Sequence, residues 1–199
     1  MKNHLRQKLT KVEDFDNPKV SLEQYITPPG LAADLIFFAY MNQDLSGKVL
    51  DLGTGTGMLA VGAALTGSKV EAVDKDEKAL NTARKNAEEI GVSDKINFKQ
   101  KEVSKVSEEF DTVLMNPPFS QHSNEGISFW ATATSVSARV YSVSPTSNRG
   151  GIKKFLQNTN HKVIDLEKFE IELPSTYGFH TKEGHKTEVD LILTEDTQK

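Results

Sequence analysis

The stretch Val49-Leu50-Asp51-Leu52-Gly53-Thr54-Gly55-Thr56-Gly57 decides the fold. Its first four residues predict a buried strand. Its glycines predict a tight turn in which the backbone can approach a ligand closely, as a side chain would not. The apolar run that starts at Met58 predicts a helix, which should end near Gly67. The stretch is therefore expected to be a strand, a turn and a helix, with a ligand at the turn.

Strands and helices alternate outward from this stretch. Further strands are predicted at 70–73, 96–98, 113–115 and 140–143, and further helices at 27–42, 76–91, 127–138 and 152–156. In two of these helices Thr27 and Asp76 are placed to cap the N-terminus. Such alternation is typical of an α/β fold with an open, mostly parallel sheet and helices on both faces. The runs 163–173 and 188–193 are too close in sequence for a helical crossover, so we expect them to pair antiparallel at one edge.

Length and composition set limits on the class of protein. The 199 residues suit one domain, which we place at 21–194, after a polar arm (1–20) and before a polar tail (195–199). Because the chain has no cysteine, disulfides and thiolate metal sites are excluded, and a cytoplasmic location is expected. The five histidines lack metal-ligand spacing, so no metal site is expected. No apolar run approaches the ~20 residues that a membrane helix needs.

Asp74 follows the glycine turn by 21 residues, at the end of the next predicted strand. A carboxylate there can accept hydrogen bonds from both hydroxyls of a ribose. A nicotinamide fold and a turn without a ligand are alternatives. Asp51 favours a different ligand, because a carboxylate would repel a pyrophosphate but attract a sulfonium or ammonium group. The turn therefore predicts S-adenosylmethionine. Glu102 and Val103, after the third strand, could bind its adenine, or Glu102 could be only an exposed loop acid.

A second motif, Asn116-Pro117-Pro118-Phe119, ends the strand 113–115. Proline fixes φ and donates no hydrogen bond, so the motif predicts a rigid platform at the end of the strand. The Asn116 side-chain oxygen and the Pro117 carbonyl could accept hydrogen bonds from an amino group and localise its lone pair. Phe119 could stack on a flat base, which would have to be unpaired or flipped out of a duplex. The alternative is a proline turn that only ends the strand.

Several motifs occur in an order that resembles a known family. They are Leu22-Glu23-Gln24-Tyr25-x-Thr27, the glycine turn, Asp74, the Asn-Pro-Pro-Phe motif, Val140-Tyr141-Ser142, Leu173-Pro174-Ser175-Thr176-Tyr177-Gly178-Phe179-His180 and Glu188-Val189-Asp190-Leu191. From about residue 20 onward, the chain resembles the methyltransferase-like family of archaea and eukaryotes that methylates adenine N6 in small-subunit ribosomal RNA.

The resemblance implies a Rossmann-like class I methyltransferase fold with a seven-stranded sheet. It implies catalytic roles for Asn116, Pro117, Pro118 and Phe119, and substrate contacts for Phe119, Phe179 and His180. It implies a cofactor site made of Gln24, Tyr25, Thr27, Asp51, Gly53, Gly55, Thr56, Gly57, Met58, Asp74, Glu102, Val103 and Asn116. In eukaryotic relatives a small zinc-binding activator protein pairs along a sheet edge. A net charge of -4 would suit a partner that supplies basic surface.

The sequence thus predicts transfer of a methyl group from S-adenosylmethionine to the N6 amine of an unpaired or flipped adenine in RNA, ribosomal RNA by the resemblance. Two alternatives stay open at this point. One is N-methylation of a protein glutamine or a small amine, since Asn-Pro-Pro-aromatic also suits planar amides. The other is a noncatalytic module that binds an adenosine cofactor, which would leave the Asn-Pro-Pro-Phe motif without a use.

Overall fold

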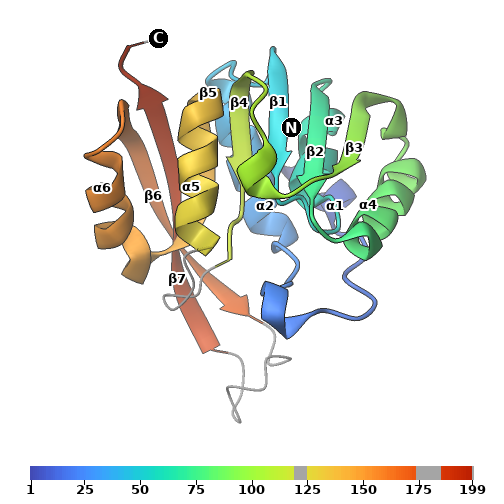
Figure 1. Ribbon diagram of the computed structural model, residues 1–199. Coiled ribbons are helices and arrows are strands. Elements are labelled where there is room, and N and C mark those ends of the chain that lie inside the picture. The colour runs from blue at the N-terminus through green and yellow to red at the C-terminus, as the bar shows by residue number, and fades with distance from the viewer. Residues whose placement is uncertain (119–124, 174–184, 199) are drawn as a thin grey trace.

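The computed structural model describes residues 1–118, 125–173 and 185–198. Within them, seven strands form one sheet: β1 (Lys48–Leu52), β2 (Lys69–Asp74), β3 (Ile96–Gln100), β4 (Phe110–Met115), β5 (Ser137–Pro145), β6 (His161–Leu173) and β7 (His185–Asp196). Their order is β3-β2-β1-β4-β5-β7-β6, as Figure 1 shows. The first five strands are parallel, and β7 is antiparallel to both of its neighbours. The predicted mixed sheet and its antiparallel pair at one edge are confirmed.

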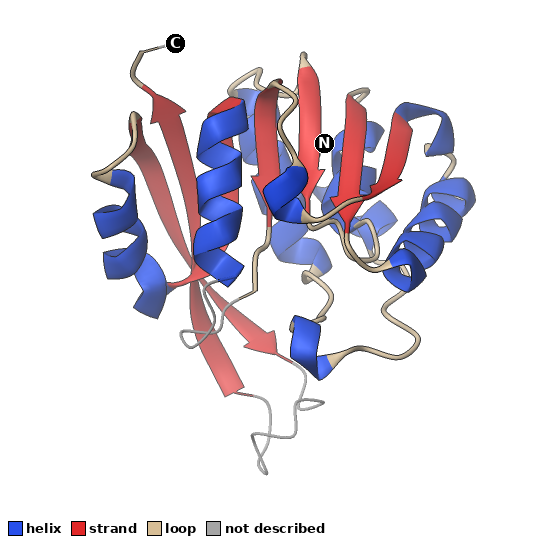
Figure 2. Cartoon of the chain, in the orientation of Figure 1, coloured by secondary structure: helices blue, strands red, loops and turns tan. Residues whose placement is uncertain are grey.

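The helices of the described residues are α1 (Lys2–Leu9), α2 (Pro29–Met41), α3 (Met58–Leu65), α4 (Glu77–Ile90), α5 (Glu125–Val136) and α6 (Arg149–Leu156), with short 3-10 turns η1 (Val20–Leu22), η2 (Ser93–Lys95), η3 (Val103–Lys105) and η4 (Thr146–Asn148). Side chains of α1, α2 and α3 are buried against one face of the sheet, and those of α5 and α6 against the other. Figure 2 shows α5 and α6 in front of the sheet and α2 behind it.

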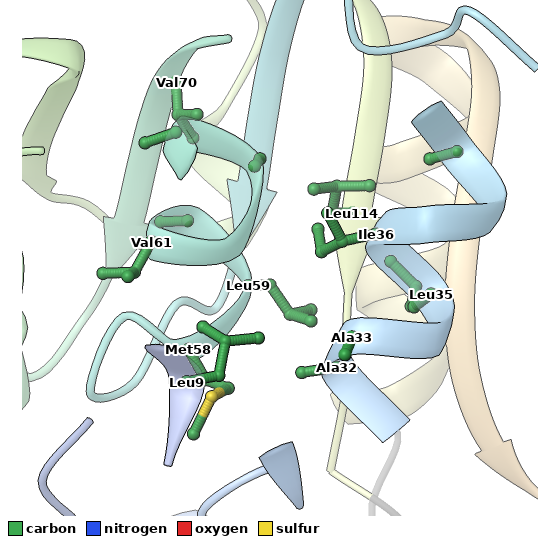
Figure 3. Close-up of a cluster of buried hydrophobic side chains, with 14 of the residues drawn as sticks. Leu9, Ala32, Ala33, Leu35, Ile36, Met58, Leu59, Val61, Val70 and Leu114 are labelled. Carbon is green, nitrogen blue, oxygen red and sulfur yellow. The ribbon is translucent and has the colours of Figure 1, made fainter. Parts of the chain in front are cut away.

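Side chains along the central strands alternate between the two faces of the sheet, so a hydrophobic core forms on each face. Leu114 packs with the α2 and α3 side, whereas Val113 and Met115 pack with the α5 and α6 side. Because both faces of β4 are covered, its run Val113-Leu114-Met115 is apolar without interruption, as its sequence had indicated. Figure 3 shows the first core, in which Leu9 of α1 lies beside Met58 and near Leu59.

The predicted helices differ from the structure in two details. The predicted cap at Thr27 is wrong, because α2 begins at Pro29 with Pro28 in the cap position and no side-chain cap bond. The Thr27 hydroxyl instead accepts a hydrogen bond from Asn116, 89 residues away. The predicted helix 127–138 ends at Val136, and β5 begins at once with Ser137. By contrast, Asp76 caps α4 as predicted, by accepting from the Lys78 amide at 3.2 Å.

Two further observations concern membranes and metals. In the part of the chain that the structure describes, no helix is long and apolar enough to cross a bilayer. The same residues contain no group of three or more His, Asp or Glu side chains arranged to hold a metal ion.

Helix α1 gives the first testable prediction, because it lies in the polar arm of the sequence yet buries Leu5 and Leu9 in the core. Leu9 is 0% exposed, so Leu9→Ala leaves a cavity and should lower the free energy of unfolding by about 2–4 kcal/mol in urea denaturation. Met41→Ala, at a side chain that is 61% exposed, is the control. If both variants changed the free energy of unfolding equally and only slightly, α1 would lie outside the part of the protein that unfolds cooperatively.

Candidate active site

A cleft opens where β1, β2, β3 and β4 end, beside the point at which the chain order of the strands reverses. Open α/β sheets bind ligands at such a point. Most of the predicted cofactor residues line this cleft: Gln24, Tyr25, Thr27, Asp51, Gly53, Gly55, Thr56, Met58, Asp74, Glu102, Val103 and Asn116, together with Pro118. Of the other predicted site residues, Gly57 caps α3 in a left-handed conformation. Phe119, Phe179 and His180 lie outside the described residues.

The glycine turn places the backbone against the cleft. Gly53 has φ +76°, and a Cβ at this position would lie 2.5 Å from the Phe129 ring of α5. Gly55 has φ +54°, and a Cβ there would lie 2.9 Å from the Phe15 ring. Both Phe15 and Phe129 line the cleft. A side chain at either glycine would therefore strain the backbone and collide with an aromatic wall of the site.

Asp51 lies beneath the turn and is only 1% exposed. Its Oδ2 accepts hydrogen bonds from the Thr54 hydroxyl at 2.6 Å and from the Ala60 amide at 2.8 Å. Burial raises the pKa of Asp51 to about 7 against these two bonds, and the negative charge of Asp74 adds to the rise. The carboxylate thus carries an unfavourable charge at neutral pH, which a cation in the cleft would stabilise.

Asp74 ends β2 on the other side of the turn. It accepts hydrogen bonds from the Gly55 amide at 2.9 Å and from the Asp76 amide at 2.9 Å. Burial raises the pKa of this carboxyl group as well, and its two backbone bonds oppose the rise. Both carboxylate oxygens are thereby oriented, and the side chain still lines the cleft.

The arm between α1 and α2 forms the lower wall of the cleft and passes below the ends of the strands in Figure 1. Asp76 holds it through Oδ2, which accepts from the Gln24 amide group at 2.8 Å and pairs with Lys19 Nζ at 2.8 Å. The Gln24 side-chain oxygen accepts in turn from the Lys19 amide at 2.9 Å. Gln24 therefore fastens the arm to the start of α4.

Asn86 of α4 anchors the beginning of the same arm. Its side chain exchanges hydrogen bonds with the Glu13 backbone, at 2.8 and 3.1 Å, and donates to the Thr56 carbonyl at 2.9 Å. Phe15, two residues after Glu13, lies against Gly55. Phe15, Asn86 and the contacts of Asp76 with the arm were not predicted from the sequence. No local pattern marks Phe15 or Asn86, since their partners lie 30 or more residues away.

Asn116 projects from the end of β4 between two residues of the arm. Its Nδ2 donates to Thr27 Oγ1 at 2.9 Å, and its Oδ1 accepts from the Tyr25 hydroxyl at 3.3 Å. The Tyr25 hydroxyl also lies 3.5 Å from the Pro117 carbonyl oxygen. The Asn116 oxygen and the Pro117 carbonyl therefore converge on one donor, as the platform hypothesis requires.

Glu102 and Val103 lie at the far end of the cleft, at the start of η3. Glu102 is exposed, while Val103 is partly covered by α5, where the Thr132 hydroxyl donates to its carbonyl at 3.3 Å. Most of the predicted site residues of the described chain thus line one cleft with four walls: the arm, the glycine turn, η3 and the platform. Gly57 and Pro117 are adjacent in sequence to lining residues.

Comparison with known proteins identifies the family. Residues 32–140, more than half of the chain, match the model of the methyltransferase small domain. The rRNA N(6)-adenosine-methyltransferase METTL5 of Danio rerio is 36% identical over 92% of this chain and 93% of its own length. The chain belongs to this family of methyltransferases.

Two further relatives agree with this assignment. The rRNA N(6)-adenosine-methyltransferase Mettl5 of Drosophila melanogaster is 33% identical over 94% of this chain and 92% of its own length. The crystal structure of a putative RNA methyltransferase from Pyrococcus horikoshii superimposes with a TM-score of 0.91 at 35% identity, over 98% of this chain and 97% of that one. The methyltransferase has the Rossmann-like fold of enzymes that use S-adenosylmethionine, as predicted.

The raised pKa of Asp51 predicts how stability depends on pH. The folded pKa, about 7, exceeds the unfolded value of 3.8. The stability gained from the protonated group is therefore present below the unfolded value and lost as the pH rises to about 7. As the pH rises from about 5 to about 8, the free energy of unfolding should fall less for Asp51→Asn than for the wild type, as measured by urea denaturation. Parallel pH profiles for the two proteins would contradict the burial argument; exposed Asp94→Asn is the control.

Proposed function

We propose that this protein transfers a methyl group from S-adenosylmethionine to the N6 amine of an unpaired or flipped-out adenine in ribosomal RNA. The observation that carries the proposal is the convergence of Asn116 Oδ1 and the Pro117 carbonyl on a single donor. An exocyclic amine carries two hydrogens and could satisfy both acceptors. The two relatives from Danio rerio and Drosophila melanogaster are rRNA N(6)-adenosine-methyltransferases, which supports an adenine in RNA as the source of this amine.

The residues of the cleft fit S-adenosylmethionine, which when bound supplies the methyl group as part of a sulfonium cation. Asp51 and Asp74 are two buried carboxylates whose ionisation burial opposes, so a positive charge nearby is favourable. We assign the ribose to Asp74, the adenine end to Glu102 and Val103, and the methionine end to backbone groups of Gly53, Thr56 and Met58. Gln24 acts by fastening the arm that closes the cleft.

The residues of this chain contribute to catalysis by positioning the target amine and by accepting its hydrogen bonds. Asn116 is fixed by its bond to Thr27, so its oxygen points to the place of the amine. Hydrogen bonds to Asn116 and Pro117 pull the amine nitrogen toward a tetrahedral shape and localise its lone pair. Phe119 is proposed to stack on the base. No strong base is required, because the methylated amine is a cation that loses its proton readily.

Labelled methyl transfer from S-adenosylmethionine to total RNA, protein and DNA, followed by nucleoside analysis, tests the reaction. We expect label in RNA as N6-methyladenosine. Label in protein would favour the glutamine or small-amine alternative, and binding of cofactor without transfer to any substrate would favour the noncatalytic one.

We also propose two features of the cellular setting. A small activator protein could add a strand next to β3 or β6, the two edge strands of the described sheet. It would add the basic surface that a chain of net charge -4 lacks for RNA.

The cytoplasmic location rests on the absence of cysteine.

Asn116→Ala separates chemistry from cofactor binding. Removing the carboxamide deletes one of the two acceptors for the amine, so methyl transfer to RNA should fall by at least about a hundredfold, as for other preorganised groups. Cofactor affinity measured by calorimetry should change little. Undiminished transfer would disprove the platform role. Asn81→Ala, on the exposed side of α4, is the control and should retain wild-type rates.

Asp74→Ala should have the opposite pattern. Two hydrogen bonds from ribose hydroxyls to a charged group are lost, so cofactor affinity should fall by about ten- to a hundredfold in calorimetry. Asp74→Asn keeps one acceptor oxygen and should lie between Ala and the wild type. Unchanged affinity in both variants would remove Asp74 from the ribose site; exposed Asp94→Ala is the matched control.

A further inference from the structure

Tyr25 lies at the one place in the described cleft where the target amine would have to bind. Its hydroxyl is within 3.3 Å of Asn116 Oδ1 and 3.5 Å of the Pro117 carbonyl oxygen. Thr27, two residues further along the arm, accepts from the other end of the same carboxamide. The arm thus contacts both ends of the Asn116 side chain, and the tyrosine occupies its reactive side.

The Tyr25 hydroxyl has fewer protons to donate than this pair of acceptors can bind. A phenol hydroxyl has one proton, so it cannot satisfy two acceptors at once. Both distances are also long compared with the usual O–H···O distance of about 2.7–2.8 Å. An amine of adenine carries two protons, one for each acceptor. It would therefore bind these oxygens better than the hydroxyl that now lies between them.

We propose that the Tyr25 hydroxyl is a placeholder for the target amine, which must displace it before methyl transfer. This inference rests on the proposed function and adds a competing residue to the same site. In the substrate-free protein the hydroxyl keeps the Asn116 oxygen turned toward the position of the amine. A base without an amino group has to break the same contacts and forms no bonds to replace them. Displacement of the hydroxyl therefore lowers the affinity for every base equally, and the selection of adenine comes from the two acceptors that its amine can satisfy.

Tyr25→Phe tests the placeholder, because it removes the hydroxyl and keeps the ring that lines the cleft. The probes are two single-stranded RNA oligonucleotides, one with adenosine at the target position and one with an unsubstituted purine there. Binding is measured with S-adenosylhomocysteine present, so that no turnover occurs. Because the variant no longer has a contact to break, both oligonucleotides should bind about two- to fivefold more tightly, by the same factor.

Combining Tyr25→Phe with Asn116→Ala tests whether the hydroxyl changes RNA affinity through its contact with Asn116. The alanine already removes one acceptor of the hydroxyl, so Tyr25→Phe should improve RNA affinity less in that background than in the wild type. In turnover assays of Tyr25→Phe alone, the fall in KM for RNA should exceed any change in kcat. Tyr40→Phe is the matched control, since Tyr40 is 43% exposed on α2 and does not line the cleft.

Three results would overturn the placeholder. Weaker or unchanged binding of both oligonucleotides would show that the hydroxyl does not compete with the base. Unequal changes would show that it contacts the bound adenine itself. An undiminished effect in the Asn116→Ala background would show that it does not act through Asn116. Failure of the proposed function is a separate outcome, namely the absence of N6-methyladenosine with wild-type protein.

Discussion

The site depends on the register between β1 and β4. Leu52 lies opposite Met115 in this parallel pair, and Leu52 also lies opposite Val73 of β2. The residues that follow these positions, Gly53, Asn116 and Asp74, therefore lie at one level. A shift by one residue would turn every side chain of a strand to the opposite face. The cores on both faces of the sheet thus fix the relative heights of the glycine turn, the Asp74 carboxylate and the platform.

The arm supplies what the sheet cannot. The ends of the strands form only one side of the cleft. Residues 13–27 form the other side, and they are held there by contacts with Asn86, Asp76 and Asn116. Each of these contacts spans more than 50 residues of sequence. They cost chain entropy to form, and the burial of α1 on the core offsets part of that cost by holding the arm at its beginning. The core and the site are in this way connected through one segment.

Local signals in the sequence were sufficient for much of this architecture. Strand 49–52 with its glycine turn, the α4 helix between Asp76 and Gly91, and the antiparallel pair of β6 and β7 each follow from residues close together in the chain. Thr27 shows where such signals fail. A threonine before two prolines has the local features of a helix cap, but a partner 89 residues away competes for its hydroxyl. Gln24 lines the cleft, but nothing near it in sequence marks Asp76 as the partner of its side chain.

The two buried carboxylates give the cleft a preference that bears on the whole catalytic cycle. The charge of Asp74 raises the cost of ionising Asp51, and the charge of Asp76 raises that of Asp74, in each case in addition to the cost of burial. On the proposed function, the positive sulfonium of the cofactor would offset part of these costs. Methyl transfer would convert the sulfonium to a neutral thioether, so the product, which keeps only its ammonium group as a positive charge, would offset less of them. On the proposed function, the burial that weakens the empty protein at neutral pH is the same property that favours substrate cofactor over product.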